Sequence, residues 1–437
     1  MQQILRIFLY IAAVLAPLFI AAALNPSDDA GIIYQTGRSF ALVGTMILIM
    51  QVLLAARIKW IEKAFGFDII IRYHKLVALF GLVLIILHPL LLVAPHGRWS
   101  LLVRLDVPWY IWMGKIALML LLINIVLSIF QQRIGMSFEN WRLSHDIISP
   151  LIIAFVFAHS IVAGFDLANP ILQSMWILIF SAAVVLFVYH RLVRPALLAR
   201  NPYHVKEVVQ EADGVWTVQM VPPGGKPHFD FTPGQFQFIT FKRGRDFPEE
   251  EHHWTISSSP QDEYVASTIK SLGDFSSTIG QTEPGDEAVI HAPFGRFSYL
   301  YHQKETELVF IAGGIGITPF ISMLRHMQNT GTEIPVVLLY GNPTEEAIVF
   351  RDELKSIEST GLKKLRVVHV IEKPGESWTG ERGFIDENII RKYTGEVSDT
   401  KGYYVVGPAA MSENVIRSLH SIGVKDRQIH QEIFSFL

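Results

Sequence analysis

Four histidines at two equal spacings lie inside apolar stretches of the chain. His74 and His88 occupy one stretch, and a second stretch contains His145 and His159, again 14 residues apart. Along an α-helix this separation is about 21 Å and about 40° short of four turns, so both members of a pair face the same way. Two such helices side by side would present two stacked imidazole pairs. That arrangement suits two haem groups placed in series across a membrane.

The order of the apolar stretches predicts which histidines pair across the helices. The two stretches are the third and fifth of six, so both cross the membrane in the same direction. His74 and His145 are therefore predicted to hold an inner haem, and His88 and His159 an outer one. Neutral imidazole is a good iron ligand, and two imidazoles leave the iron no open position. The alternative, a hydrogen bond from each histidine to a neighbouring helix, explains four depth-matched histidines poorly, because intramembrane ionisable residues are rare and usually functional.

The composition is that of a membrane protein with a soluble portion. Half of the 437 residues are apolar, the mean hydropathy is +0.33, and nearly all of the apolar excess precedes residue 195. The net charge of −3 predicts no nucleic-acid partner. The sequence contains no cysteine, which excludes disulfides, thiolate-bound iron–sulfur clusters, cysteine-attached haem and a catalytic thiol. Imidazole alone must hold any haem.

Each of the six apolar segments approaches the length that spans a bilayer as a helix. They cover residues 4–24, 39–57, 73–94, 109–130, 146–164 and 171–193. Lysine and arginine are enriched in the loops after the second, fourth and sixth segments, which predicts that both termini are cytoplasmic. The run Ala21-Ala22-Ala23 resembles a signal-peptide cleavage site, but the apolar region before it is long, and a retained first helix is favoured.

Three polar residues near the membrane boundaries have two interpretations each. Arg38 and His96 lie near the outer end in this topology, where they could hold an acceptor or a haem propionate, or simply be solvated. His190 closes the sixth segment and is interpreted as interfacial rather than as a haem ligand.

After Asn201-Pro202 the sequence changes to alternating strands and turns. This pattern predicts an antiparallel β-barrel to about residue 300. From Glu307 a strand, a glycine turn, a helix and a second strand follow in order, which predicts a βαβ unit opening a parallel sheet. The predicted domains are residues 1–200, 201–303 and 304–437.

The predicted barrel contains two segments suited to a flavin nucleotide. The first is a strand in which an aromatic residue that can pack on a flavin precedes a hydroxyl that can bond the ring edge; it comprises His252, His253, Trp254, Thr255, Ile256 and Ser257. In the second, glycine and hydroxyl residues before a short helix could hold a pyrophosphate; its candidates are Lys270, Gly273, Ser276 and Ser277. Trp and Thr are common in strands that bind no ligand. The prediction of a flavin site therefore depends on both segments together.

A glycine run follows the first strand of the predicted βαβ unit. Glycines let the backbone approach a phosphate, and proline suits the first turn of a helix. The predicted nucleotide-binding residues are Gly313, Gly314, Gly316, Thr318 and Pro319. The run departs from the usual G-x-G-x-x-G spacing, and the strand–helix context carries the prediction.

Taken together, these motifs resemble the ferric reductase/NADPH oxidase superfamily over nearly the whole chain. In that family a six-helix haem domain is fused to a ferredoxin–NADP reductase-like dehydrogenase. The resemblance implies haem ligation by the four histidines. It matches an H-P-F-T flavin motif to residues 252–255, a G-P-F-G turn to residues 292–295, and a nucleotide turn to Gly407 and Pro408. It also implies that Phe434 or Phe436, near the C-terminus, shields the flavin; with Thr255 these are the predicted catalytic residues.

Two departures from the family pattern bear on the nucleotide. Val406 stands where many relatives place a cysteine beside the nicotinamide, so a thiol cannot take part in hydride transfer. Residues 340–344 lack an arginine that NADPH-specific relatives often use for the 2′-phosphate. NADH, NADPH or both remain open as electron donors.

The resemblance implies a transmembrane relay. NAD(P)H would pass a hydride to FAD, electrons would cross two b-type haems, and an acceptor outside would be reduced. Oxygen, giving superoxide, is the leading acceptor; a ferric chelate, or a partner protein that takes electrons from the outer haem, is the alternative. The expected setting is a bacterial plasma membrane, with no cytosolic activator required.

Overall fold

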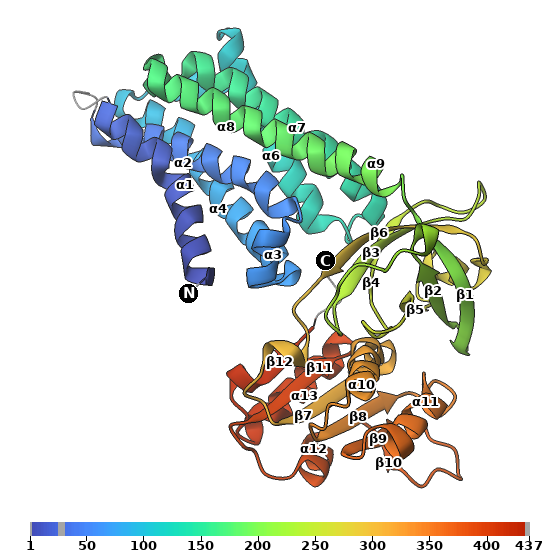
Figure 1. The fold of residues 1–437 in the computed structure, drawn as a ribbon. Helices are drawn as coiled ribbons and strands as arrows, with labels where there is room; N and C mark the ends of the chain where they lie inside the picture. Colours follow the sequence, from blue (N-terminus) through green and yellow to red (C-terminus); the bar gives the residue numbers. More distant parts are fainter. Residues whose placement is uncertain (1, 25–30, 433–437) are drawn as a thin grey trace. The chain divides into compact units, whose positions relative to one another are not determined.

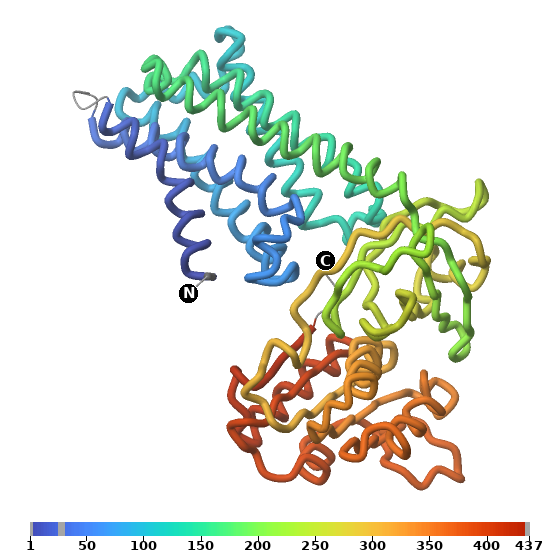
Figure 2. The backbone as a smooth tube through the Cα atoms, viewed as in Figure 1, coloured from blue at the N-terminus to red at the C-terminus, as the bar shows by residue number. Residues whose placement is uncertain are grey.

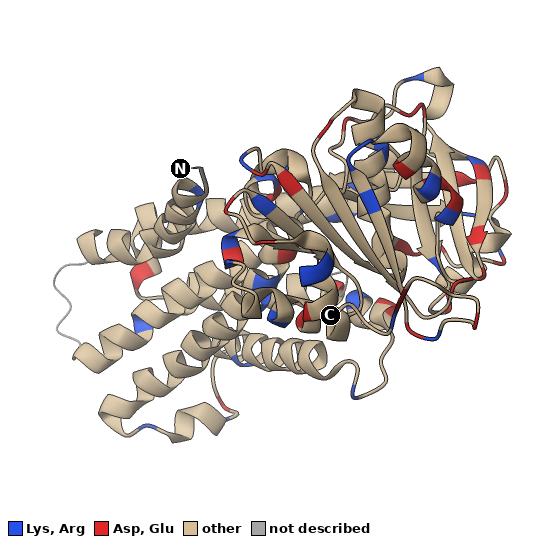
Figure 3. Ribbon diagram, turned by 90° about the horizontal axis from the view of Figure 1, so that it is seen from below, with Lys and Arg blue, Asp and Glu red and all other residues tan. Residues whose placement is uncertain are grey.

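The structure is a computed structural model that describes residues 2–24 and 31–432. It divides into two compact units, Met1–Ala196 and Leu197–Leu437. The helices of the first unit carry few charged residues, whereas charges are spread over the second unit (Figure 3). Each unit is described by itself.

The first unit is entirely helical (Figure 1). Six of its helices are long and apolar enough to cross a membrane: α1 (Gln2–Leu24), α2 (Ile32–Ala55), α4 (Phe67–Val93), α6 (Trp109–Phe130), α7 (Phe138–Ala163) and α8 (Pro170–Val188). They confirm the six predicted segments. The short helices α3 (Lys59–Phe65), α5 (Ser100–Val103) and α9 (Arg194–Leu198) lie between or after them.

Three of the helices begin earlier than hydropathy predicts. Helix α7 begins at Phe138, where Ser137 caps it by accepting a hydrogen bond of 3.3 Å from the backbone N–H of Asn140. Helices α2 and α4 likewise begin before the predicted apolar segments, at Ile32 and Phe67. Hydropathy marks the apolar span, whereas capping and backbone hydrogen bonding decide where the helix begins.

Helix α2 packs along α4, and α6 packs along α7 (Figure 2). Glycines let the first pair approach closely. A Cβ on Gly81 of α4 would lie 2.8 Å from Ile47 of α2, and one on Gly44 of α2 would lie 2.9 Å from Ile85. Small residues at such contacts are the usual means by which membrane helices associate. In the described helices α4 and α7 do not pack closely along their lengths.

The second unit contains two six-stranded sheets. The first is antiparallel, in the order β4-β3-β6-β1-β2-β5. Its strands are β1 (Tyr203–Ala212), β2 (Val215–Val221), β3 (Phe236–Lys242), β4 (Glu251–Thr255), β5 (Val265–Lys270) and β6 (Glu287–Phe294). Alternating apolar residues of these strands form one core that includes Val218, Ile239 and Phe241, all fully buried.

The second sheet is parallel, in the order β10-β9-β8-β7-β11-β12. Its strands are β7 (Glu307–Gly313), β8 (Val336–Asn342), β9 (Leu365–Ile371), β10 (Glu381–Arg382), β11 (Lys401–Val406) and β12 (Ile429–Gln431). The connecting helices are α10 (Thr318–Thr330), α11 (Arg351–Ser356), α12 (Glu387–Thr394) and α13 (Ala409–Ser421). Buried residues of this sheet pack into two separate cores, as expected for a sheet with helices on both faces. The carboxyl end of β7 leads directly into the glycine run.

Candidate functional site

The structure brings the four membrane histidines together as two pairs. His74 of α4 faces His145 of α7 with ring centroids 6.3 Å apart, and His88 faces His159 with centroids 6.5 Å apart. Both pairs join α4 to α7, two helices whose backbones do not pack along each other. The space between these helices is therefore bridged at two levels by opposing imidazoles.

These separations fit an iron atom between the rings. A metal–nitrogen bond of about 2 Å, with the ring centroid about 1.1 Å beyond the nitrogen, places two ligating imidazoles about 6.3 Å apart. Both observed pairs lie within a few tenths of an ångström of that value. The donor set therefore fits two bis-histidine haems, and their presence stays a prediction.

Backbone groups fix the orientation of His88 and His159, the pair predicted to be the outer one. Nδ1 of His88 lies 2.9 Å from the carbonyl oxygen of Gly37, and Nδ1 of His159 lies 2.8 Å from that of Tyr110. A ring that donates from Nδ1 to a carbonyl presents Nε2 as the metal ligand. Metal-binding histidines are usually oriented by such a hydrogen bond. Gly114 makes room for one of these rings, since a Cβ there would lie 2.8 Å from Nδ1 of His159.

An ion pair lies on the same side as this outer pair. Nε of Arg38 donates to Asp166 at 3.0 Å, and a second, shorter contact joins the same two side chains. Both side chains are largely buried, and the guanidinium also lies over the ring of Phe165, 4.4 Å from its centroid. The other boundary residue, His96, contacts the ring of Tyr34. Arg38 is thus charge-paired within the protein.

The predicted flavin strand is β4, an edge strand of the antiparallel sheet. Trp254 packs against Phe275 and lies 5.4 Å from the ring of His252. Thr255 follows on the opposite face, because successive strand residues alternate. Its hydroxyl is buried and forms no hydrogen bond among the described residues. A buried hydroxyl without a partner at a strand end is a position that a flavin edge would satisfy.

The same strand accounts for the remaining residues of the motif. His253 packs between Phe236 and Phe238 on the Thr255 side of β4. Ile256 and Ser257 are fully buried beyond its end. Ile256 and Ser257 therefore belong to the core beyond the strand, whereas His253 is only partly buried.

The predicted pyrophosphate segment is a tight turn after β5, which ends at Lys270. The hydroxyl of Ser276 accepts from the backbone N–H groups of Leu272 and Gly273, at 2.9 and 3.0 Å. The Ser277 hydroxyl donates to the carbonyl of Asp274 at 2.8 Å. Both serines are thus used to hold the turn itself, a role that the sequence pattern did not predict.

The glycine run lies between β7 and α10, with Pro319 in the first turn of the helix. Gly314 has φ of +54°, and a Cβ there would meet nothing within 4 Å. Gly316 differs, because a Cβ would lie 2.5 Å from the carbonyl oxygen of Val406, at the end of β11. Gly314 therefore supplies an open backbone turn, whereas Gly316 allows the loop to pack against the neighbouring strand.

The turn at Gly407 and Pro408, which is also predicted to bind the nucleotide, lies beside the glycine run. A Cβ on Gly313 would meet the sulfur of Met411 at 2.3 Å and Cδ of Pro408 at 3.0 Å. Likewise, a Cβ on Gly407 would lie 3.2 Å from the backbone of Gly313. The carboxyl ends of β7 and β11 therefore meet where a parallel sheet binds its ligands. Thr318 is buried beside them and donates to the carbonyl of Ile315 at 3.1 Å.

Replacing Gly316 with valine is expected to raise the KM for the nucleotide about tenfold, or about 1.4 kcal/mol. The added atoms would push the loop away from Val406 and carry the phosphate-facing turn with it. Steady-state kinetics with an artificial dye as acceptor measure this, and haem absorption should not change. Gly375→Val, at an exposed loop position with an ordinary 3.5 Å contact, is the matched control. An unchanged KM in Gly316→Val would contradict the assignment.

Sequence analysis missed the residues that join the two sheets. Nη1 of Arg325 in α10 donates to the Ser257 carbonyl at 2.8 Å, and the Ser322 hydroxyl donates to the Ser258 carbonyl at 2.7 Å. These bonds connect the glycine-run helix to the loop after β4. Their partners are more than 60 residues apart, and no local pattern marks them. Phe434 and Phe436, the predicted shielding residues, lie outside the described residues.

Three family models match this chain in the order of its structural parts. The ferric reductase like transmembrane component matches residues 40–156, an FAD-binding domain matches residues 203–288, and an oxidoreductase NAD-binding domain matches residues 310–417. The chain therefore combines a ferric-reductase-like transmembrane domain with FAD-binding and NAD-binding domains, as fused flavocytochromes of the ferric reductase and NADPH oxidase type do.

Individual relatives match about a third to a half of the chain. The chain is 39% identical over 150 residues to "Nitrate reductase [NADPH]" of Emericella nidulans, which covers 32% of this chain and 17% of that protein. It is 26% identical to "Sulfhydrogenase 2 subunit gamma" of Pyrococcus furiosus, over 53% of this chain and 84% of the relative. This chain spans about a fifth of the length of the two nitrate reductases it matches.

One solved structure aligns with most of the chain. It is a flavohemoglobin from Malassezia yamatoensis with bound FAD and heme, at 17% identity and a TM-score of 0.50, covering 93% of this chain and 99% of that one. This likeness concerns the fold alone. The family models and the six apolar helices identify an integral, multi-pass membrane oxidoreductase with FAD-binding and NAD-binding domains.

Proposed function

We propose that this protein transfers electrons from cytosolic NADH or NADPH, through FAD and two bis-histidine b-type haems, to oxygen on the outer side of a membrane, forming superoxide. One observation carries the proposal: two histidine pairs on the same two helices, with centroids 6.3 and 6.5 Å apart. A transmembrane protein that needed only helix contacts would have no use for two such bridges between poorly packed helices.

The residues that would hold each group follow from the site. His74 with His145, and His88 with His159, would hold the haem irons; the β4 edge with Thr255 would hold the flavin. FAD, when bound, accepts a hydride and releases electrons singly, and bis-histidine haem carries one electron without an open ligand position. The protein itself binds the nucleotide at the glycine run, aligns it beside Val406, and excludes thiol chemistry there.

Oxygen is favoured as the acceptor by the charge balance near the outer pair. Arg38 is paired with Asp166, and among the other cations of this side Arg104 is paired with Asp106. The other two cations near this end, Arg98 and Lys115, are matched in number by Asp28 and Asp29 in the sequence, so this side has no excess positive charge to attract an anionic ferric chelate. A small neutral acceptor needs no such charge. The charge balance thus supports oxygen over a chelate or an acidic partner protein.

The first test uses purified protein loaded with haem and FAD. The haems are reduced by NADH or NADPH without oxygen, and then air or ferric citrate is admitted. Rapid haem reoxidation by air with stoichiometric superoxide is expected. Slow reoxidation by air with fast reoxidation by ferric citrate would instead identify a ferric-chelate reductase.

Replacing Asp166 with asparagine is expected to shift this preference toward the chelate. The change leaves the Arg38 cation unpaired, and a fixed positive charge attracts an anionic acceptor. The ratio of ferric citrate to oxygen reduction should rise roughly tenfold at low ionic strength and fall again in salt. Glu387→Gln, at the exposed Arg391 pair of α12, makes the same charge change in the second unit and is the control. A ratio that does not move in Asp166→Asn would show that Arg38 does not face the acceptor.

A further inference from the structure

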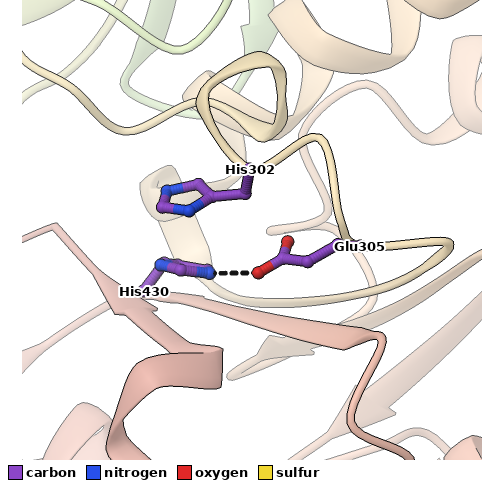
Figure 4. Close-up of side chains that lie close together, drawn as sticks. All are labelled: His302, Glu305 and His430. Carbon is purple, nitrogen blue, oxygen red and sulfur yellow. Dashed lines mark hydrogen bonds and ion pairs between the residues drawn. The ribbon is translucent and has the colours of Figure 1, made fainter.

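Three side chains in the second unit converge outside the predicted flavin and nucleotide sites. His302 and Glu305 lie in the connector between the antiparallel sheet and β7, and His430 lies on β12 (Figure 4). Their potential ligand atoms all lie within 4.8 Å of one another. Residues 128 positions apart in the sequence thus present two imidazoles and a carboxylate to one point.

In the existing contacts of this cluster one ligand atom of His430 is bonded to Glu305, and a metal would replace that bond. Nε2 of His430 lies 2.6 Å from an oxygen of Glu305. His302 lies over His430 with ring centroids 3.8 Å apart, contacts the ring of Tyr404, and forms no hydrogen bond among the described residues. A neutral imidazole is the form that binds a metal.

A second layer of contacts orients the carboxylate. The Tyr404 hydroxyl donates to the second oxygen of Glu305 at 2.7 Å, and the Glu305 side chain is only 11% exposed. Metal-binding carboxylates are characteristically held in this way, by a hydrogen bond to the oxygen that does not bind the metal.

We propose that His302, Glu305 and His430 form a binding site for a divalent transition metal of the zinc type. Two imidazoles and one carboxylate are ligands of Zn²⁺ or Ni²⁺ rather than of Mg²⁺ or Ca²⁺, which prefer oxygen alone. Ligands of a tetrahedral zinc lie about 3.3 Å apart, so side-chain movements of about 1 Å complete the site. Three protein ligands leave a fourth position for water.

The metal would clamp the edge of the parallel sheet. Strand β12 has only three residues and pairs with β11 alone. His430 lies on this strand, whereas the other two ligands lie in the connector before β7. Binding would therefore fix the last described strand of the chain to the connector between the two sheets, and so make stability of this edge depend on metal concentration.

The test measures zinc bound to the full-length protein, loaded with haem and FAD and stripped of loose metal. Equilibrium dialysis against micromolar Zn²⁺, followed by elemental analysis, is expected to give one more zinc per chain in the wild type than in His302→Asn or Glu305→Gln. His420→Asn is the control, because His420 is an exposed histidine of the same unit paired with Asp426. Ni²⁺ should compete for the site and Mg²⁺ should not.

Hydrogen exchange supplies an independent measurement on the same variants. Zinc is expected to slow amide exchange in β12 about tenfold in the wild type and in His420→Asn, but not in His302→Asn. His302 makes ring contacts only, so its replacement should leave flavin content unchanged and keep the variant folded. Equal zinc binding by wild type and His302→Asn would overturn the proposal. It would leave the Tyr404–Glu305–His430 bonds as a purely structural network.

Discussion

Replacing His74 with alanine is expected to leave one haem per chain and to stop electron transfer to an outside acceptor, while the nucleotide still reduces the flavin. The ring of His74 is one of two ligands facing each other across 6.3 Å. Removing a residue that only hydrogen-bonds to a metal ligand typically lowers activity roughly 10–100-fold, and removing the ligand itself should lower it further. Transfer across the membrane should therefore fall by at least about 100-fold. Haem content per protein and dye reduction by NADH or NADPH measure the two parts separately.

Double replacements test the pairing as well as the ligands. His74→Ala combined with His145→Ala removes both ligands of one iron, so the double variant should still retain one haem. His74→Ala combined with His159→Ala takes one ligand from each pair and should retain none. Two ligands of one haem act as a unit, so the second replacement causes no further loss of haem. Replacements at two independent haems cause losses that add.

His190→Ala is the matched control for these variants. His190 lies in the first unit, in the π-turn after α8, and no described histidine faces it as a partner ligand. Its replacement should leave both haems and full activity. A full haem complement in His74→Ala would refute the pairing, and so would loss of both haems in the double variant of His74 and His145.

The membrane part of the fold was the most predictable from sequence. Long apolar runs have no stable alternative to a helix in a bilayer, since every backbone polar group must be satisfied internally. The 14-residue spacing then placed His74 and His145, and His88 and His159, at matched levels without any knowledge of loops. The helix ends were less predictable. Polar first turns such as that of α7 carry no hydropathy signal, and the helix begins where Ser137 caps it.

The soluble site was predictable in outline only. The glycine run was located correctly between β7 and α10, but the reason for Gly316 is the carbonyl of Val406, about 90 residues further along the chain. In the same way, the serines of the turn after β5 bond to the turn itself. Local patterns identify a segment, whereas long-range contacts decide what each of its residues does.

Arg325 is the clearest case of a long-range contact that no motif marks. Its guanidinium forms a two-pronged ion pair with Glu353, at 2.6 and 2.7 Å, and also donates to the Ser257 carbonyl. The Arg325 side chain is 18% exposed and that of Glu353 is 33% exposed. Paired in this geometry, the charge is satisfied inside the protein, and one side chain joins the two sheets.

Replacing Arg325 with methionine is therefore expected to destabilise the second unit by about 2–4 kcal/mol. Breaking a fully buried pair costs about 3–5 kcal/mol because it leaves an uncompensated charge, and the partial exposure of Glu353 reduces this. Methionine keeps much of the apolar bulk, so the loss reports the polar contacts. At about 2–4 °C per kcal/mol for a domain of this size, the thermal release of flavin should occur at least about 4 °C lower.

An exposed pair in the same unit is the control for this prediction. Arg391 and Glu387 form an i,i+4 pair on α12, with side chains 54% and 41% exposed. Exposed pairs contribute about 0.3–0.5 kcal/mol, because solvent screens them and ordering two long side chains costs entropy. Arg391→Met should therefore lower the release temperature by no more than about 2 °C. Equal shifts in the two variants would mean that the bond between α10 and the Ser257 loop does not hold the sheets together. Only a larger loss in Arg325→Met, with the haem spectrum unchanged, is consistent with a stabilising contact confined to the dehydrogenase.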